Sequence, residues 1–412
     1  MAEVLTGTQR EQTAEPSRRA WPGWLRRWAV ERLDLDKLGI DFVLPGGTRL
    51  ASANGRPLAT VRVLHAVDLF RMLWDPEDTF AEGYTTGRIE VDGDLEGLLE
   101  RIYTVSRNRR SPEWYTAQGL LEGTRGRARA SVRRHYDLGN DFYARWLDRD
   151  MVYTCAYFPR ADLTLEQAQV AKLDLVCRKL RLTPGETVFE AGCGWGALAL
   201  HMARNYGVTV RAFNISHEQI LFARERAARE GISNVEFVED DYRAITGHCD
   251  AFVSIGMLEH VGTRHYESLG QVIDRTLGPD GRGLLHFIGR NQPRQLNRWI
   301  RRHIFPDAYA PTLDEVCAGV LRPANFSVLD VENLRLHYAL TLRHWRERFE
   351  QHEPAVREQY GAEFVRTWRM YLAGSEASFV SGSVQLFQIL FARGETNRVH
   401  WTRDWLMDGA SA

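Results

Sequence analysis

The sequence predicts an α/β protein, with a largely parallel sheet covered by helices on both faces and a small α+β domain ahead of it. Three observations support this fold class. From about residue 165 strand-like and helix-like segments alternate, a glycine-rich loop separates the first strand from its helix, and short apolar runs alternate with turn signals over residues 40–103. Strands that alternate with helices of about 10–15 residues are typical of parallel sheets.

The composition is that of an ordinary globular protein. The 412 residues are 44% hydrophobic and 26% charged, with a formal net charge of −1. That length allows roughly two or three domains. Because the overall charge is near zero, it indicates no nucleic-acid partner.

The five cysteines form no recognisable pattern. They are odd in number, widely spaced and without a CxxC pair: Cys155, Cys177, Cys193, Cys249 and Cys317. Neither a disulfide framework nor a zinc site is predicted, and no metal is expected. A reducing cytoplasm suits free thiols. Since no apolar run of about 18 residues is present, contact with a membrane is expected only peripherally, at its inner face.

Four regions are predicted along the chain. Residues 1–35 form a disordered or amphipathic segment, 36–105 a small N-terminal domain, 106–134 a basic linker and 135–400 the main domain. Within the N-terminal domain, HAVDLFRMLW and LEGLLERIY have helical spacing, whereas LPGGT, ANGRP and VDGD are turn signals.

Two segments are rich in positive charge. In RRAWPGWLRRWAVERL, three tryptophans alternate with four arginines: Trp21, Trp24 and Trp28 with Arg18, Arg19, Arg26 and Arg27. This is typical of an interfacial amphipathic helix, but a surface helix packed on its own domain explains it equally well. Residues 101–134 hold nine arginines against Glu113 and Glu122. They form either a solvated linker or a patch that attracts anionic headgroups, by about 1 kcal/mol per basic residue.

The main domain is predicted element by element. Strands are expected at 186–192, 208–216, 235–241, 249–256 and 283–289, and helices at 197–207, 217–231 and about 265–277. Segments 326–334 and 383–394 are expected to close the sheet as an antiparallel hairpin, separated by a long helical insertion rich in aromatic residues.

The glycine-rich loop FEAGCGWG follows the first strand and opens a helix. Gly192, Gly194 and Gly196 allow close approach of the backbone to a ligand, and the helix N-terminus offers free N–H groups. A nicotinamide dinucleotide and S-adenosylmethionine are both candidates. The acid Glu190, two residues before the first glycine, and the GxGxG spacing favour S-adenosylmethionine. The second strand also ends in FNIS, without the acid that holds the ribose of NAD.

Four motifs occur in order and at compatible spacing: RRHYDLGNDFYARWLDRDMVYTCAYFPRADLTLEQAQVAKLDLV, VFEAGCGWGALALHMA, SIGMLEHVG and LLHFIG. Together they resemble the cyclopropane-fatty-acyl-phospholipid synthases, with the mycolic acid cyclopropane synthases as more distant relatives. The resemblance covers residues 131–394. In addition, FAEGYTTGRIEVDGDLEGLL is similar to the family's small lipid-associated N-terminal domain.

This resemblance implies a Rossmann-like class I S-adenosylmethionine-dependent methyltransferase fold with a helical acyl-binding insertion. It implies methylene transfer from S-adenosylmethionine to a cis double bond in a phospholipid acyl chain, with bound bicarbonate as the base. An alkene is a weak nucleophile, so the site must align the reactants and exclude water. Aromatic faces can stabilise the resulting cation, and a base must remove a proton before the ring closes.

The resemblance also assigns residues. Those expected in the reaction pocket are Glu259, His286, Tyr338, Cys155 and Ile288. The expected cofactor contacts are Tyr136, Tyr153, Thr154, Glu190, Gly192, Gly194, Gly196, Asn214, Ile215, Ser216, Gln219, Asp241 and Tyr242. His260 is a further neighbour that could orient Glu259. Phospholipid acyl chains are the expected partners, and a homodimer is possible.

Several residues have an alternative interpretation. Cys155, in VYTCAYF, is a pocket-lining thiol, a nucleophile or a core residue, and no histidine within a few residues would activate it. His286 lies in an apolar strand and could be an ordinary core histidine. The segment LNRWIRRHIFPDAYAP is either a cap over the acyl pocket with a basic, membrane-facing side or a solvated helix.

Two other functions are compatible with these residues. A small change in the position of the cation or base would give a methyl or methylene branch in place of a ring. A lipid-binding protein with an inactive methyltransferase domain is the third hypothesis, but the intact glycines and acid–base residues argue against it.

Overall fold

The computed structural model describes residues 31, 34–52, 55–107, 138–399 and 401–403. Within them the chain forms a four-stranded sheet and a seven-stranded sheet. The predicted Trp- and Arg-rich segment, residues 18–28, lies outside the described residues, as does nearly all of the predicted basic linker. Among the helices of the described residues, none has the length and apolar composition needed to cross a membrane.

The four-stranded sheet forms the core of an N-terminal α+β unit. Its strands are β1 (Asp41–Val43), β2 (Arg49–Leu50), β3 (Ala59–Val63) and β4 (Ile89–Gly93), in the order β2-β1-β3-β4. Its helices are α2 (Leu35–Leu38), α3 (Ala66–Trp74), α4 (Pro76–Thr85) and α5 (Leu95–Arg107). Strand β3 alternates buried Ala59, Val61 and Val63 with less buried residues, as expected when helices cover one face of a sheet.

The seven-stranded sheet has the order β10-β11-β9-β8-β5-β6-β7. Its strands are β5 (Thr187–Ala191), β6 (Thr209–Asn214), β7 (Val235–Glu239), β8 (Cys249–Ile255), β9 (Leu277–Gly289), β10 (Phe326–Asn333) and β11 (Gln385–Arg393). The strands from β5 to β9 pair in parallel, and β10 and β11 are antiparallel. The accompanying helices are α8 (Leu165–Lys179), α9 (Ala197–Tyr206), α10 (His217–Arg229) and α11 (Tyr266–Thr276).

The predicted Rossmann-like α/β fold is therefore confirmed, including the closing antiparallel pair. The strand β9 is longer than predicted because it begins at Leu277 and not near residue 283. Strands β6 and β8 lie on opposite sides of β5. In sheets of this kind ligands bind at the carboxyl ends of the strands, where the strand order reverses.

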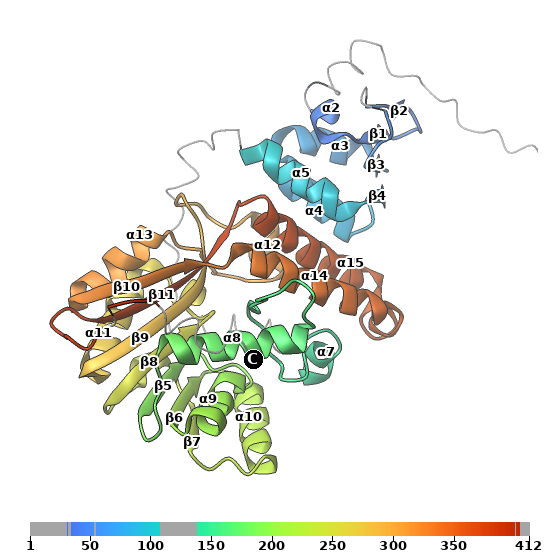
Figure 1. The fold of residues 1–412 in the computed structure, drawn as a ribbon. Helices are drawn as coiled ribbons and strands as arrows, with labels where there is room; N and C mark the ends of the chain where they lie inside the picture. The colour runs from blue at the N-terminus through green and yellow to red at the C-terminus, as the bar shows by residue number, and fades with distance from the viewer. Residues whose placement is uncertain (1–30, 32–33, 53–54, 108–137, 400, 404–412) are drawn as a thin grey trace, which may run out of the picture.

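Helices also lie between the seven-stranded sheet and the N-terminal unit. These are α12 (Arg298–His303), α14 (Arg335–Gln351) and α15 (Glu353–Val380), and the last two form the predicted helical insertion between β10 and β11. Figure 1 shows the N-terminal unit stacked on this layer, and α4 and α5 both contact α15. Short elements are α7 (Asn140–Ala144), α13 (Leu313–Val316), a π-turn Cys317–Leu321 and the 3-10 turns Tyr242–Ala244, Leu258–His260, Thr263–His265 and Arg322–Ala324.

Ion pairs join α12 to α4. Arg298 pairs with Asp75, and Arg302 lies 3.0 Å from Glu82 and 3.3 Å from Asp78. The segment predicted as a cap with a basic, membrane-facing side thus directs two of its arginines toward acids of the N-terminal unit. Its Trp299 is buried. These contacts hold the two units together on one side of the helical layer.

Candidate functional site

A cavity of about 170 Å³ lies at the carboxyl ends of β5, β6 and β8. The glycine-rich loop forms part of its wall, and α9 starts directly behind it. Gly192 and Gly196 have φ angles of +86° and +83°. A Cβ at Gly196 would lie 2.7 Å from the ring of Phe237, and one at Gly192 would lie 2.9 Å from Met257. Only glycine fits both the conformation and the space at these two positions.

Most of the predicted cofactor residues line this cavity. They are Tyr153, Thr154, Glu190, Gly192, Gly194, Asn214, Ile215, Gln219, Asp241 and Tyr242. Gly196 and Ser216 instead occupy the positions just before α9 and α10. Tyr136 lies outside the described residues.

Asn214 connects the loops around the cavity. Its Nδ2 donates to the Gly194 carbonyl at 3.2 Å and to Gln219 Oε1 at 2.8 Å, and its Oδ1 accepts from the backbone N–H of Ile215 at 2.8 Å. One side chain therefore ties the glycine loop to the start of α10. This explains why an amide, and not an acid, ends the second strand.

Glu190 is a buried carboxyl with spare hydrogen-bonding capacity. It is 2% exposed, and its Oε2 has no hydrogen-bond partner among the described residues. Burial raises its pKa to about 8, although the nearby Lys172 ammonium partly opposes this shift. A buried carboxyl oxygen without a hydrogen-bond partner fits a ligand group that is cationic or that carries an N–H donor.

Lys172 belongs to the site although the sequence analysis did not identify it. It is 1% exposed on α8, and its Nζ donates to Thr154 Oγ1 at 2.8 Å. One turn earlier, Gln169 Nε2 donates to the Thr154 carbonyl at 2.9 Å. Burial lowers the pKa of Lys172 to about 8. The spacing of three residues places both side chains on one helix face, and this is the signal that could have revealed them.

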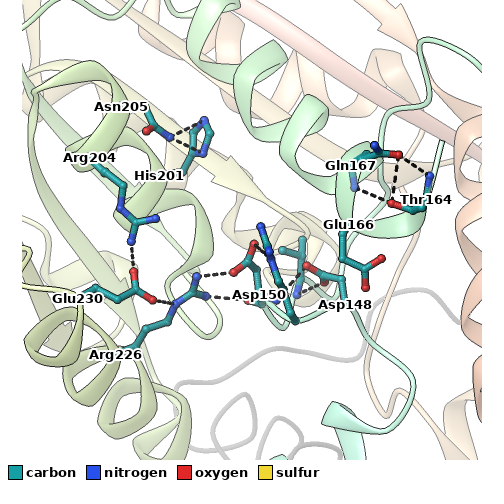
Figure 2. Close-up of polar contacts among 12 residues, drawn as sticks. Asp148, Asp150, Thr164, Glu166, Gln167, His201, Arg204, Asn205, Arg226 and Glu230 are labelled. Atoms are coloured by element: carbon teal, nitrogen blue, oxygen red, sulfur yellow. Dashed lines mark hydrogen bonds and ion pairs between the residues drawn. The ribbon is translucent and has the colours of Figure 1, made fainter.

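The loop before Thr154 is held by two carboxylates (Figure 2). Asp148 accepts from the backbone N–H of Val152 at 2.8 Å and of Asp150 at 3.0 Å. Asp150 in turn pairs with Arg226 of α10, which also contacts Glu230. These bonds fix the chain that leads to Tyr153 and Thr154.

A second cavity, of about 280 Å³, lies between the sheet, the helical insertion and the N-terminal unit. Its walls are largely apolar. The N-terminal unit contributes Leu35, Leu38, Ile40, Phe42, Val61, Met72, Phe80 and Leu98, and the insertion contributes Tyr338, Leu342, Met370, Tyr371 and Phe379. Walls of this kind suit an apolar ligand.

The two cavities share a wall. Tyr153, Thr154, Gly256 and His260 line both. The Tyr153 hydroxyl lies 2.7 Å from that of Tyr371, and burial lowers the pKa of His260 to about 4, so its ring is neutral near pH 7. A ligand in the first cavity and a ligand in the second would therefore meet at these residues.

Glu259 and His286 line the second cavity near this junction. Glu259 Oε1 accepts from the backbone N–H of Ile288 at 2.6 Å, whereas its Oε2 is buried without a partner among the described residues. Burial raises the pKa of Glu259 to about 7. His286 is 2% exposed, its Nε2 also lacks a partner there, and burial lowers its pKa well below the usual value. Two unsatisfied polar atoms in one cavity indicate a polar ligand.

Neighbouring residues determine which ring nitrogen of His286 carries the proton. Lys179 Nζ lies 2.8 Å from Gln388 Oε1, and Gln388 Nε2 lies 3.0 Å from His286 Nδ1. An ammonium can only donate, so it requires the oxygen of the Gln388 amide on its side. The amide nitrogen then donates to Nδ1, which leaves the proton on Nε2. His286 thus presents an N–H donor to the cavity.

Cys155, Tyr338 and Ile288 also line this cavity. Cys155 is fully buried, its Sγ contacts the Ala156 carbonyl at 3.1 Å, and burial raises its pKa well above the usual value. A thiol in this state is not nucleophilic, which favours the lining interpretation. The ring of Tyr338 packs against Phe379 with centroids 4.5 Å apart.

Sequence comparison finds relatives over most of this chain. The family model of mycolic acid cyclopropane synthetase matches residues 124–389. The chain is 36% identical to the cyclopropane-fatty-acyl-phospholipid synthase of Escherichia coli K12, covering 85% of this chain and 92% of the relative. It is 34% identical to a probable fatty acid methyltransferase of Pseudomonas putida, and the match covers 84% of this chain and 91% of the relative.

A solved structure extends the comparison. The mycolic acid cyclopropane synthase CmaA1, in complex with SAH and CTAB, is 31% identical and has a TM-score of 0.61, covering 64% of this chain and 97% of that one. With the matched motifs and the two cavities, these similarities show that the chain belongs to the cyclopropane synthetase family of S-adenosylmethionine-dependent methyltransferases.

Proposed function

We propose that this enzyme forms a cyclopropane ring at a cis double bond in an acyl chain of a membrane phospholipid, with bicarbonate as the general base. The shared wall of the two cavities is the observation that carries the proposal. On one side of this wall lies the cavity with the glycine-rich loop, which suits S-adenosylmethionine. On the other lies an apolar cavity in which Glu259 Oε2 and His286 Nε2 have no hydrogen-bond partner among the described residues. When bound, S-adenosylmethionine supplies the methyl carbon and bicarbonate the base.

The protein's contribution begins with alignment. The apolar walls exclude water and hold an alkyl chain beside Tyr153 and Thr154. The alkene would bond to the methyl carbon as the carbon–sulfur bond of S-adenosylmethionine breaks, with S-adenosylhomocysteine as the leaving group, and the positive charge left on the chain would face aromatic rings. Tyr153, Tyr338 and Tyr371 are among the aromatic residues that line the cavity. Their electron-rich faces would stabilise this charge.

The polar atoms of the cavity fit bicarbonate. His286 Nε2–H would donate to one of its oxygens, as would the Tyr338 hydroxyl, and the unsatisfied Glu259 Oε2 would accept its O–H. Glu259 is itself held by the N–H of Ile288. Bicarbonate held by these residues would take one proton from the transferred carbon, and the electrons of that C–H bond would form the second ring bond, so this carbon would enter the product as CH₂.

The test is incubation of purified protein with S-adenosylmethionine and vesicles of cis-monounsaturated phospholipid, with and without bicarbonate. Released fatty acids that gain one CH₂ and show upfield ring protons by NMR, in a bicarbonate-dependent manner, would support the proposal. A mass gain without ring signals would indicate a methyl or methylene branch. Intact cofactor binding without any mass gain would exclude this acceptor.

The roles of Glu259 and His286 need their own variants. Glu259→Gln and His286→Ala should abolish product formation while calorimetry still detects S-adenosylmethionine binding. Near-normal turnover by either variant would refute the bicarbonate site. Thr276→Val is a suitable control, because Thr276 is fully buried outside both cavities and its Oγ1 donates to carbonyls of its own helix.

A further inference from the structure

Helix α3 of the N-terminal unit has two apolar faces. Leu69 and Met72 point inward and are 6% and 7% exposed, whereas Val67, Phe70 and Trp74 are 53%, 58% and 84% exposed. The outward residues are spaced three and four apart, so they form one stripe along the helix. A soluble protein seldom exposes several large apolar side chains in one stripe without a partner for them.

The inner face of this helix lines the second cavity of about 280 Å³, which is proposed to hold the acyl chain and is called the acyl cavity below. Met72 is part of the cavity wall, and Pro76 and Glu77 of the next helix line it as well. Trp74, the most exposed residue of the stripe, is therefore two residues from Pro76 along the chain. The exposed stripe and the cavity are separated only by the thickness of α3.

Charges on α3 suit a lipid surface. Arg71 is exposed beside Phe70, whereas the acid Asp68 is fully buried against Arg88. The next acid along the chain, Asp75, pairs with Arg298. The outward stripe thus combines two aromatic residues with one cation, as interfacial helices do. The arginines of α12 are a weaker candidate because those described above are already paired with α4.

We propose that the outer face of α3 docks on the phospholipid bilayer, with Phe70 and Trp74 inserted at the level of the headgroups. This inference rests on the proposed function, because it is the acyl substrate that requires a bilayer at this wall. Docking there places the cavity wall that contains Met72 and Pro76 beside the membrane. An acyl chain can then enter along α3 without crossing water.

The test uses vesicles of cis-monounsaturated phosphatidylethanolamine and phosphatidylglycerol. The double variant Phe70→Ser/Trp74→Ser should lose at least about tenfold in vesicle affinity by co-sedimentation, since two large apolar side chains no longer enter the interface. Phe70→Leu/Trp74→Leu should retain most of the binding. Leu221→Ser and Leu336→Ser, which alter exposed leucines of α10 and α14, should bind like the wild type.

Activity provides a second measurement. The serine double variant should show a raised KM on vesicles but turnover within about twofold of the wild type on a short-chain unsaturated phospholipid below its micellar concentration. Unchanged vesicle binding, or equal loss of activity on both substrates, would overturn the proposal. Dissociation of a wild-type dimer by the serine variant would also overturn it, because the stripe would then be a protein interface. Vesicle binding without product from any lipid would refute the proposed function alone.

Discussion

The amide of Gln388 lies 3.0 Å from Nδ1 of His286, and the two residues are direct partners on β11 and β9. Because Lys179 holds the oxygen of this amide, the proton of the His286 ring is placed on the nitrogen that faces the acyl cavity. Gln388, on the neighbouring strand, thus decides whether His286 donates or accepts a hydrogen bond there.

The Gln388→Glu substitution tests this relationship. A carboxylate can only accept from Nδ1, so the ring proton should move to Nδ1 and Nε2 should become an acceptor. We expect turnover to fall by at least about a hundredfold, with S-adenosylmethionine affinity unchanged. Nitrogen-15 NMR of the histidine ring should report protonated Nδ1.

Gln385→Glu, on the same strand but bonded to Asn333 and Gly382, should leave the His286 signals in place. Identical tautomers in both variants would contradict the assignment.

Lys172 should determine cofactor affinity. Lys172→Met removes the hydrogen bond to Thr154 and the cation near Glu190, and we expect the Kd for S-adenosylmethionine to rise by roughly tenfold. Isothermal calorimetry would measure this change. Thr154→Val removes only the hydrogen bond, so its effect should be smaller. An equal effect would show that the charge of Lys172 is unimportant.

Arg226 should stabilise the loop that precedes the shared cavity wall. Its side chain is 10% exposed and connects Asp150 to Glu230. We expect Arg226→Met to lower the free energy of unfolding by about 1–3 kcal/mol and to raise the KM for S-adenosylmethionine. The control is Arg204→Met, which loses an ion pair with Glu230. Because the Arg204 side chain is 48% exposed, we expect the free energy of unfolding to fall by less than about 1 kcal/mol. Urea denaturation would measure the free energy of unfolding of both variants. Equal losses would contradict the role of Arg226 in holding the loop.

The Glu190 carboxyl should make stability depend on pH. Its folded-state pKa is raised to about 8 from 4.5, so the folded protein retains a proton that the unfolded chain loses. This contribution is fully present below about pH 4.5 and is lost as the pH rises through 8. Glu190→Gln cannot titrate. We therefore expect the difference in melting temperature, wild type minus Glu190→Gln, to decrease as the pH rises from 5 to 8.5. Both proteins are measured without cofactor. A constant difference would show that Glu190 is ionised throughout.

The sequence by itself determined the order of strands and helices and the glycine-rich loop. These depend on local patterns, such as the GxGxG spacing and the alternation of apolar runs, which restrict the backbone over a few residues. The family motifs also pointed to Glu259, His286 and Tyr338, and the structure brings all three to the wall of one cavity. Their assigned roles remain predictions.

Only the tertiary structure decided which distant residues meet. Gln388 has no unusual sequence context, and the spacing of Gln169 and Lys172 shows only that they share a helix face. What either Lys172 or Gln388 contacts is recognisable only from the packing. The acyl cavity likewise takes part of its wall from the N-terminal unit and part from the helical insertion, some 300 residues apart in the chain. Contacts at such separation depend on how whole elements pack, because no local pattern encodes the distance between two surfaces.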